Sequence, residues 1–203
     1  YDSQKGSISI GGQKLCDMSL EALNSRISYV AQDQYLFNTS LLENIRLGRL
    51  NATDEEVVEA AKKAQCMEFL EKLPQGIHSM AGDAGKMLSG GQRQAVTLLM
   101  ATLKKPKLLL LDEHTAALDP KTAAKVLMLS EKIVEENHLT TLMITHNMKD
   151  AIKYGNRLIM MHEGHIIYDV SGKEKKNLHV SDLLAKFQIA SGGEFANDRM
   201  ILS

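Results

Sequence analysis

Two neighbouring carboxylates, Asp112 and Glu113, follow an apolar run in the middle of the chain. The run, Leu108 to Leu111, has the length of a strand buried on both faces, which is typical of parallel sheets. Open α/β sheets bind ligands at the carboxyl ends of such strands. In phosphoryl transfer, one carboxylate there holds Mg²⁺ and its neighbour activates the attacking water. We assign Asp112 to the first role and Glu113 to the second, against the simpler interpretation of a solvated turn.

Two glycines stand at the start of an earlier helical pattern. Ser89 and Gln92 have the spacing of a capping box, but a box alone does not explain Gly90 and Gly91 between them. Glycine lets backbone N–H groups come close to an anion, and the positive end of a helix favours the same charge. The segment therefore predicts an anion site, to which the Ser89 hydroxyl also contributes.

Two further polar residues follow strand-like runs. Gln32 comes after Ile27 to Ala31, and His146 comes after Thr141 to Thr145. If the strands are neighbours, His146 emerges at the same sheet edge as Glu113 and could contact a terminal phosphate. Each signal is weak by itself, because an amide at a strand end usually serves a turn and a single histidine is usually a surface residue.

The elements that must position these residues alternate between helix and strand. A helix that is apolar on most sides is expected from Ser89 until Pro106, and Asp119 with Pro120 starts another that runs to about Asn137. A buried strand follows each helix, and this order implies parallel crossovers and an α/β fold. Before these elements we expect a strand with its turn over residues 6–12 and a helical insert over 38–75, in which Thr53 and Glu56 form a capping box. After them we expect a short helix over 147–154, a hairpin over 157–168 and a last helix over 182–187 that Ser181 caps.

Composition argues against several classes of function. Lys plus Arg number 24 and Asp plus Glu 25, so no basic field points to nucleic acid or anionic lipid as a partner. Cys16 and Cys66 have no zinc-site or disulfide spacing, and we expect both in the core of a protein from a reducing compartment. The apolar runs are shorter than the roughly 20 residues that cross a bilayer.

Together the motifs resemble those of the ATP-binding-cassette (ABC) family, in the order of that family. Five motifs carry the resemblance: Gln32 as the Q-loop, Leu88 to Gln94 as the signature, Leu108 to Glu113 as the Walker B strand, Ala117 to Asp119 as the D-loop and His146 as the switch histidine. The similarity runs from Tyr1 to about Tyr168.

The resemblance implies an ATP-hydrolysing transporter subunit with a P-loop-NTPase-like fold. Residues 1–37 would form part of the core, 38–88 the helical subdomain, 89–170 the catalytic core, and 171–203 a C-terminal helix and tail. The implied ligands are ATP and Mg²⁺, with Glu113 and His146 catalytic and Asp112 and Gln32 at the metal. The implied nucleotide contacts come from Gln32, Ser89, Gly90, Gly91, Gln92 and Asp119.

The resemblance also implies partners. A second cassette subunit, identical or different, would pair head to tail, so that Ser89, Gly90 and Gly91 act in trans on ATP held by the other subunit. A transmembrane permease would bind at the cytoplasmic face of the membrane, with a solute-binding protein in the case of an importer, and no nucleic acid is expected.

Two alternatives stay open. A soluble cassette ATPase acting on DNA or ribosomes usually carries coiled-coil insertions or basic linkers, and neither occurs between Gln32 and Leu88. A degenerate or chimeric module that only contributes its signature in trans would explain a missing loop, but not the presence of Glu113 and His146.

The chain departs from the family pattern at one motif. It contains no Gly-x-x-x-x-Gly-Lys-Ser/Thr loop, which normally holds the phosphates. Gly85-Lys86 is no substitute, because Met80 and Met87 stand where the loop needs Gly and Ser or Thr. Tyr1 to Gly6 resembles the stretch after the Walker A helix, so we expect a chain cut just downstream of that loop.

Two parts of the chain resemble different branches of the family. Tyr35 to Thr39 and Thr53 to Gly85 are similar to exporters whose cassette is fused to the membrane domain. From Ala95 onward the chain is similar to stand-alone cassettes of amino-acid-type importers, such as those proposed for tryptophan or tyrosine. We infer a recombined or mis-joined sequence whose switch falls inside the signature.

We predict that the 203-residue chain alone hydrolyses ATP negligibly, because nothing in it holds the phosphates in cis. A magnesium-dependent phosphate-release assay on the purified chain and on a Glu113→Gln control should give the same background rate. Robust turnover that Glu113→Gln abolishes would contradict this prediction.

Overall fold

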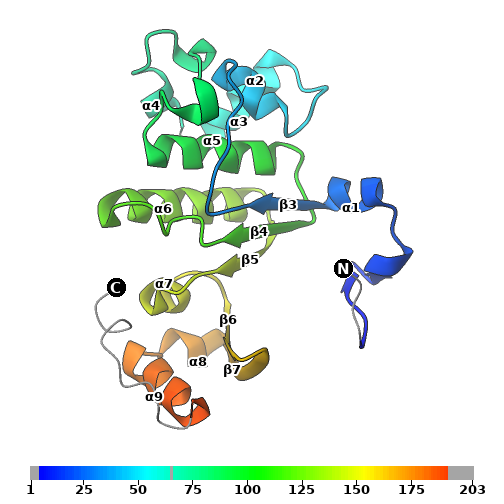
Figure 1. Ribbon diagram of the computed structural model, residues 1–203, viewed down its shortest axis with the longest axis vertical. Coiled ribbons are helices and arrows are strands. Elements are labelled where there is room, and N and C mark those ends of the chain that lie inside the picture. The colour runs from blue at the N-terminus through cyan, green and yellow to red at the C-terminus, as the bar shows by residue number, and fades with distance from the viewer. Residues whose placement is uncertain (1–4, 65, 192–203) are drawn as a thin grey trace. The chain divides into compact units, whose positions relative to one another are not determined.

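A sheet of three parallel strands organises the first of two compact units, Tyr1–Ile144 and Thr145–Ser203, in the computed structural model, which describes residues 5–64 and 66–191. The strands lie in the order β3 (Ile27–Val30), β4 (Leu108–Asp112) and β5 (Thr140–Ile144). The register pairs Val30 with Leu111 and Asp112 with Ile144. The three carboxyl ends therefore lie at one edge of the sheet, as Figure 1 shows, and the predicted parallel α/β arrangement is confirmed.

The two faces of this sheet differ, because side chains alternate along each strand. One face is buried beside helix α5 (Gly90–Leu103), which packs against β3 and against α6 (Pro120–Glu136). The buried residues of this face include Val30, Leu109 and Leu111. On the other face, Tyr29, Leu142 and Ile144 are exposed.

The starts of both long helices are the predicted ones. Ser89 and Gln92 form the expected capping box ahead of α5, and Asp119 is the N-cap of α6 with Pro120 as its first residue. The α5 helix is buried on most sides, as its apolar composition predicts.

A helical insert covers α5 in the first unit (Figure 1). It contains α2 (Leu41–Arg46), α3 (Asp54–Lys63) and α4 (Met67–Leu70), and α3 begins at the predicted capping box of Thr53 and Glu56. Ahead of β3, the predicted strand and turn become the antiparallel pair β1 (Ser9–Ile10) and β2 (Gln13–Lys14). A helix that the sequence did not predict, α1 (Leu20–Arg26), follows with Ser19 as its N-cap.

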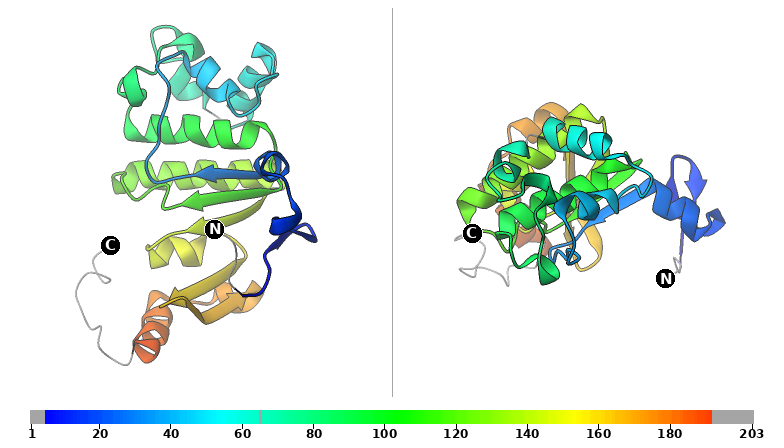
Figure 2. Two further views of the ribbon diagram at one scale, coloured as in Figure 1. Left: turned by 45° about the vertical axis from the view of Figure 1, so that its right-hand side comes forward. Right: turned by 90° about the horizontal axis from the view of Figure 1, so that it is seen from above.

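The second unit is built on a hairpin, which Figure 2 shows together with its helices. Its strands β6 (Arg157–His162) and β7 (His165–Ser171) are joined by Glu163 and Gly164, which both have positive φ, as a tight hairpin turn requires. Three helices, α7 (Met148–Lys153), α8 (Gly172–Lys176) and α9 (Val180–Ala190), pack on this hairpin or on one another. The hairpin and α7 were predicted, and α8 was not.

Two local predictions are wrong. The last helix begins one residue before Ser181, with His179 as its N-cap, because Asp182 accepts the His179 backbone N–H at 2.7 Å. Cys16 is exposed rather than in the core, while Cys66 is buried as expected. The part of the predicted C-terminal tail over residues 192–203 lies outside the described residues. No helix in the described part of the chain combines the length and the apolar character needed to span a bilayer.

We predict that Asn44→Ala lowers the free energy of unfolding by roughly 2–3 kcal/mol, because it leaves buried backbone groups without partners. The fully buried Asn44 amide accepts the Phe37 N–H at 2.8 Å and donates to the carbonyls of Phe37 and Ser40, each at 3.0 Å. Urea unfolding measures the cost. The exposed Asn38→Ala is the control, with an expected change within about 0.5 kcal/mol. Equal costs for the two variants would refute the prediction.

Candidate functional site

The carboxylate pair lies at the sheet edge where the sequence predicts it. Asp112 is the last residue of β4 and is half-buried, and its Oδ2 accepts a hydrogen bond of 2.7 Å from the Tyr29 hydroxyl of β3. That bond raises the pKa of Tyr29 above its ordinary value. Glu113 follows with a φ of 45° and donates its N–H to the Ile144 carbonyl at 3.0 Å. The backbone of Glu113 is therefore held at the end of β5 in a conformation that non-glycine residues seldom adopt.

A buried hydrogen bond anchors the residues after Glu113 to helix α6. His114 is 2% exposed, and its Nε2 lies 3.0 Å from the hydroxyl of buried Ser130. The Ser130 hydroxyl donates its single hydrogen to the Val126 carbonyl at 2.9 Å, so it accepts from a protonated Nε2. Burial lowers the pKa of His114 to about 4, and the imidazole is neutral at neutral pH.

The predicted anion site is presented to solvent at the start of α5. Ser89 is exposed, its hydroxyl accepts the Gln92 N–H at 3.3 Å, and the Gln92 side chain accepts the Ser89 N–H at 2.9 Å. Arg93 donates to the Leu88 carbonyl at 2.9 Å, which fixes the chain just before the helix. Ser89 is thus not hidden within its own chain, as a role in trans requires.

The remaining predicted residues differ in how they are placed. Gln32 is exposed two residues beyond β3, at the edge that carries Asp112, and its carbonyl accepts a bond from Gln34. Asp119 accepts the backbone N–H groups of Lys121 and Thr122 at the start of α6. His146 follows β5 by two residues and belongs to the second unit. The first unit therefore brings Gln32, Asp112 and Glu113 to one edge.

The residues at this edge suit a magnesium ion only together with a nucleotide. No three His, Cys, Asp or Glu side chains in the described ranges are grouped to hold a metal ion by themselves. Mg²⁺ in phosphoryl-transfer sites usually takes one or two protein oxygens and completes its shell with phosphates and water. The carboxylate of Asp112 and the amide oxygen of Gln32 are oxygen ligands of this kind.

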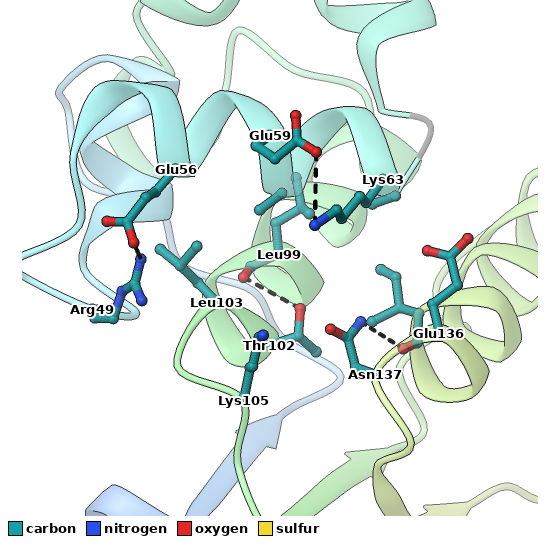
Figure 3. Close-up of a pocket in the computed structure, with 13 residues that line it drawn as sticks. Arg49, Glu56, Glu59, Lys63, Leu99, Thr102, Leu103, Lys105, Glu136 and Asn137 are labelled. Carbon is teal, nitrogen blue, oxygen red and sulfur yellow. Dashed lines mark hydrogen bonds and ion pairs between the residues drawn. The ribbon is translucent and has the colours of Figure 1, made fainter.

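A pocket of about 200 Å³ lies at the other ends of the same helices (Figure 3). It is lined by Leu99 and Leu103 near the C-terminus of α5 and by Glu136 near that of α6, whereas Ser89 and Asp119 stand at the N-termini. Its charged rim is largely paired internally, as in the ion pairs from Arg49 to Glu56 at 2.7 Å and from Lys63 to Glu59 at 3.6 Å. This pocket is separate from the carboxylate edge.

Sequence reasoning missed the residues that hold the site in place. Tyr29 was not singled out, although its place in a predicted strand next to β4 would have put it on the face of Asp112 once the register was known. The His114 and Ser130 pair had only a weak signal, a histidine directly after two carboxylates and a serine within an apolar helix pattern.

Comparisons with known proteins find similarity to proteins of one family. The family model described as ABC transporter matches residues 1–116, more than half of the chain. A tyrosine transport ATP-binding protein of Clostridioides difficile (strain R20291) is 59% identical over 103 residues, which cover 51% of this chain and 41% of that protein. The mitochondrial iron-sulfur clusters transporter atm1 of Aspergillus fumigatus is 35% identical over 198 residues, which cover 98% of this chain and 27% of that protein.

A solved structure gives the same result. The structure of a bacterial Atm1-family ABC exporter with ATP bound has a TM-score of 0.76 and 29% identity, over 92% of this chain and 33% of that one. This chain therefore spans less than half the length of these relatives. Relatives of both predicted kinds, exporter and amino-acid transport cassette, are found, while the position of the switch between them stays a prediction.

We predict opposite effects for two buried Ser→Ala substitutions near the site. Ser130→Ala should cost roughly 1–3 kcal/mol of unfolding free energy, because the buried His114 N–H loses its acceptor. Ser28→Ala should be neutral or stabilising, because no described residue makes a hydrogen bond with the buried Ser28 hydroxyl. Urea unfolding of both variants checks the pair, and a larger cost for Ser28→Ala would count against the His114 anchor.

Proposed function

The chain belongs to the ABC transporter family, and from this premise we propose that it is the ATP-binding and ATP-hydrolysing part of a transporter, acting as one half of a nucleotide-sandwich dimer. The observation that carries the proposal is the common edge of β3, β4 and β5, where Gln32, Asp112 and Glu113 lie at the carboxyl ends of parallel strands. Ligands of open α/β sheets bind at that edge.

The roles at this edge follow from the chemistry of each side chain. Asp112 and Gln32 would hold Mg²⁺, which when bound neutralises charge on the phosphates. Glu113 would accept a proton from the attacking water, and His146 would donate a hydrogen bond to the terminal phosphate. Asp119, whose pKa is lowered by its hydrogen bonds with Thr122, stays ionised as the cap of α6.

No phosphate-binding loop occurs within these 203 residues, and we therefore propose that the signature of the chain acts on ATP held by a partner. Ser89, Gly90 and Gly91 would contact ATP held by a second cassette, for which the exposure of Ser89 is the support. The sheet has room for the strand and helix of such a loop: in the described residues β5 pairs only with β4, and Tyr29, Leu142 and Ile144 leave one face exposed. Parallel sheets are usually covered on both faces.

An exposed apolar surface in the first unit supports a membrane partner. Tyr35 and Phe37 are 60% and 54% exposed and their rings meet edge to face at 5.4 Å. The Thr39 carbonyl accepts the Ala81 N–H, and the Ala81 carbonyl accepts the Met87 N–H. These bonds join the loop of exposed Met87 to the segment that carries Tyr35 and Phe37. We propose that this surface binds the cytoplasmic part of a transmembrane permease, with the chain at the membrane as a peripheral subunit.

A non-catalytic module is the second candidate, favoured by the missing phosphate-binding loop. Such a module would dimerise with a nucleotide-bearing partner and supply Ser89 without turning over ATP itself.

We predict trans complementation between two defective proteins. One is this chain, with an intact Ser89 and no phosphate loop; the other is an extended variant that carries the strand, loop and helix of a relative ahead of residue 1 together with Ser89→Arg. Each alone should be inactive, and their mixture should hydrolyse ATP, because one complete site then forms between them.

The controls distinguish the ATP-hydrolysing subunit from the non-catalytic module. Ser89→Arg in this chain should abolish the activity of the mixture, whereas Ser25→Arg on exposed α1 should leave it unchanged. ATP-dependent association without hydrolysis would favour the non-catalytic module. Full activity of the mixture with Ser89→Arg in both proteins would rule out the role in trans.

A further inference from the structure

The two glycines at the start of α5 face the start of α6 in the same chain. A methyl group built on Gly91 would lie 2.4 Å from Cγ2 of Thr122, and one built on Gly90 would lie 2.9 Å from Cδ2 of Leu118. Carbon atoms in favourable contact stand about 3.5–4.0 Å apart. The packing of α6 therefore requires a bare backbone here, independently of any bound anion.

The two contacts differ in how easily they give way. Leu118 meets Gly90 with the far end of a flexible side chain, which can shift by a few tenths of an ångström. Thr122 is β-branched, and its only rotatable bond is restricted within a helix. The contact with Gly91 is therefore the stiffer of the two.

Thr122 is further fixed by the residue that caps its helix. The Asp119 carboxylate accepts the Thr122 backbone N–H at 3.1 Å, and the Thr122 side chain is the largest cause of the lowered pKa of Asp119. The hydroxyl and the methyl of Thr122 share one carbon, so the rotamer that directs the methyl at Gly91 also fixes the direction of the hydroxyl. Rotating the methyl away from Gly91 would therefore also turn the hydroxyl.

We propose that Thr122 is a positioning residue that couples Gly91 of the signature to Asp119 of the D-loop within one chain. A displacement at Gly91 moves the Thr122 methyl, and with it the hydroxyl on the same carbon and the backbone N–H that Asp119 accepts. The consequence for transport rests on the proposed function, in which Gly91 contacts ATP held by a second cassette. A signature that closes on the ATP of a partner then shifts the segment between Glu113 and Asp119 of its own chain.

A double-mutant cycle on the purified chain tests the contact. Gly91→Ala should lower the melting temperature by about 4–8 °C, because it overpacks the methyl of Thr122. In a Thr122→Ser background the methyl is gone and the nearest remaining atom, Cβ of residue 122, lies at 3.9 Å. There Gly91→Ala should be neutral or stabilising, since Ala favours a helix over Gly. Gly90→Ala is the matched control, and Thr122→Ser should not change its effect.

A second readout tests the coupling rather than the packing. Carboxyl NMR titration should show a higher pKa for Asp119 in Gly91→Ala than in the unchanged chain, and no such rise when Thr122→Ser is also present. Thr122→Val keeps the methyl and loses the hydroxyl, so it should raise the pKa of Asp119, whereas Thr122→Ser should not. This comparison holds even if Gly91→Ala does not fold.

The proposal is overturned if Gly91→Ala costs the same in both backgrounds, or if the pKa of Asp119 is the same in Thr122→Val and Thr122→Ser. These measurements need no nucleotide. If trans complementation fails while the double-mutant cycle gives the expected result, the proposed function is wrong and the contact between Gly91 and Thr122 still holds.

Discussion

The parallel pairing of β4 with β3 and β5 is the constraint on which the site depends. Its register aligns Asp112 with Ile144 and Leu111 with Val30. A slip of one residue would move Asp112 to the buried face and Leu111 to the exposed one, because side chains alternate along a strand. The correct register places the Asp112 carboxylate beside the Tyr29 hydroxyl and lets Glu113 bond the end of β5.

Features that cost stability gather around this edge and the helix start that accompanies it. Glu113 has a φ of 45°, and the two side-chain amide atoms of fully buried Gln94, the last residue of the signature, have no hydrogen-bond partner among the described residues. Gly90 and Gly91 give up helix propensity in the first turn of α5. Such departures from local rules are expected where a fold is shaped for a ligand or a moving part, and the apolar core around Leu98 and Leu109 compensates for them.

The sequence was sufficient for what local chemistry decides. The capping residues Ser89 and Asp119 and the apolar run before Asp112 predicted the helix starts and the buried strand, because these signals involve only near neighbours. The sequence did not predict the strand register, the contact of Tyr29 with Asp112 or the bond of His114 with Ser130, because each of them joins residues distant along the chain. The prediction of Ser181 as the cap of the last helix was wrong, because His179 and Asp182 form the cap instead.

The central claim is that nucleotide lies between the carboxylate edge of one cassette and Ser89 of another. The most direct test is paramagnetic broadening in this chain, labelled with ¹⁵N and mixed with an unlabelled cassette that holds Mn²⁺ and ATP on its own phosphate-binding loop. Selective loss of the amide signals of Ser89, Gly90 and Gly91 is the result we expect. Association with the loaded partner that leaves those signals sharp would contradict the account.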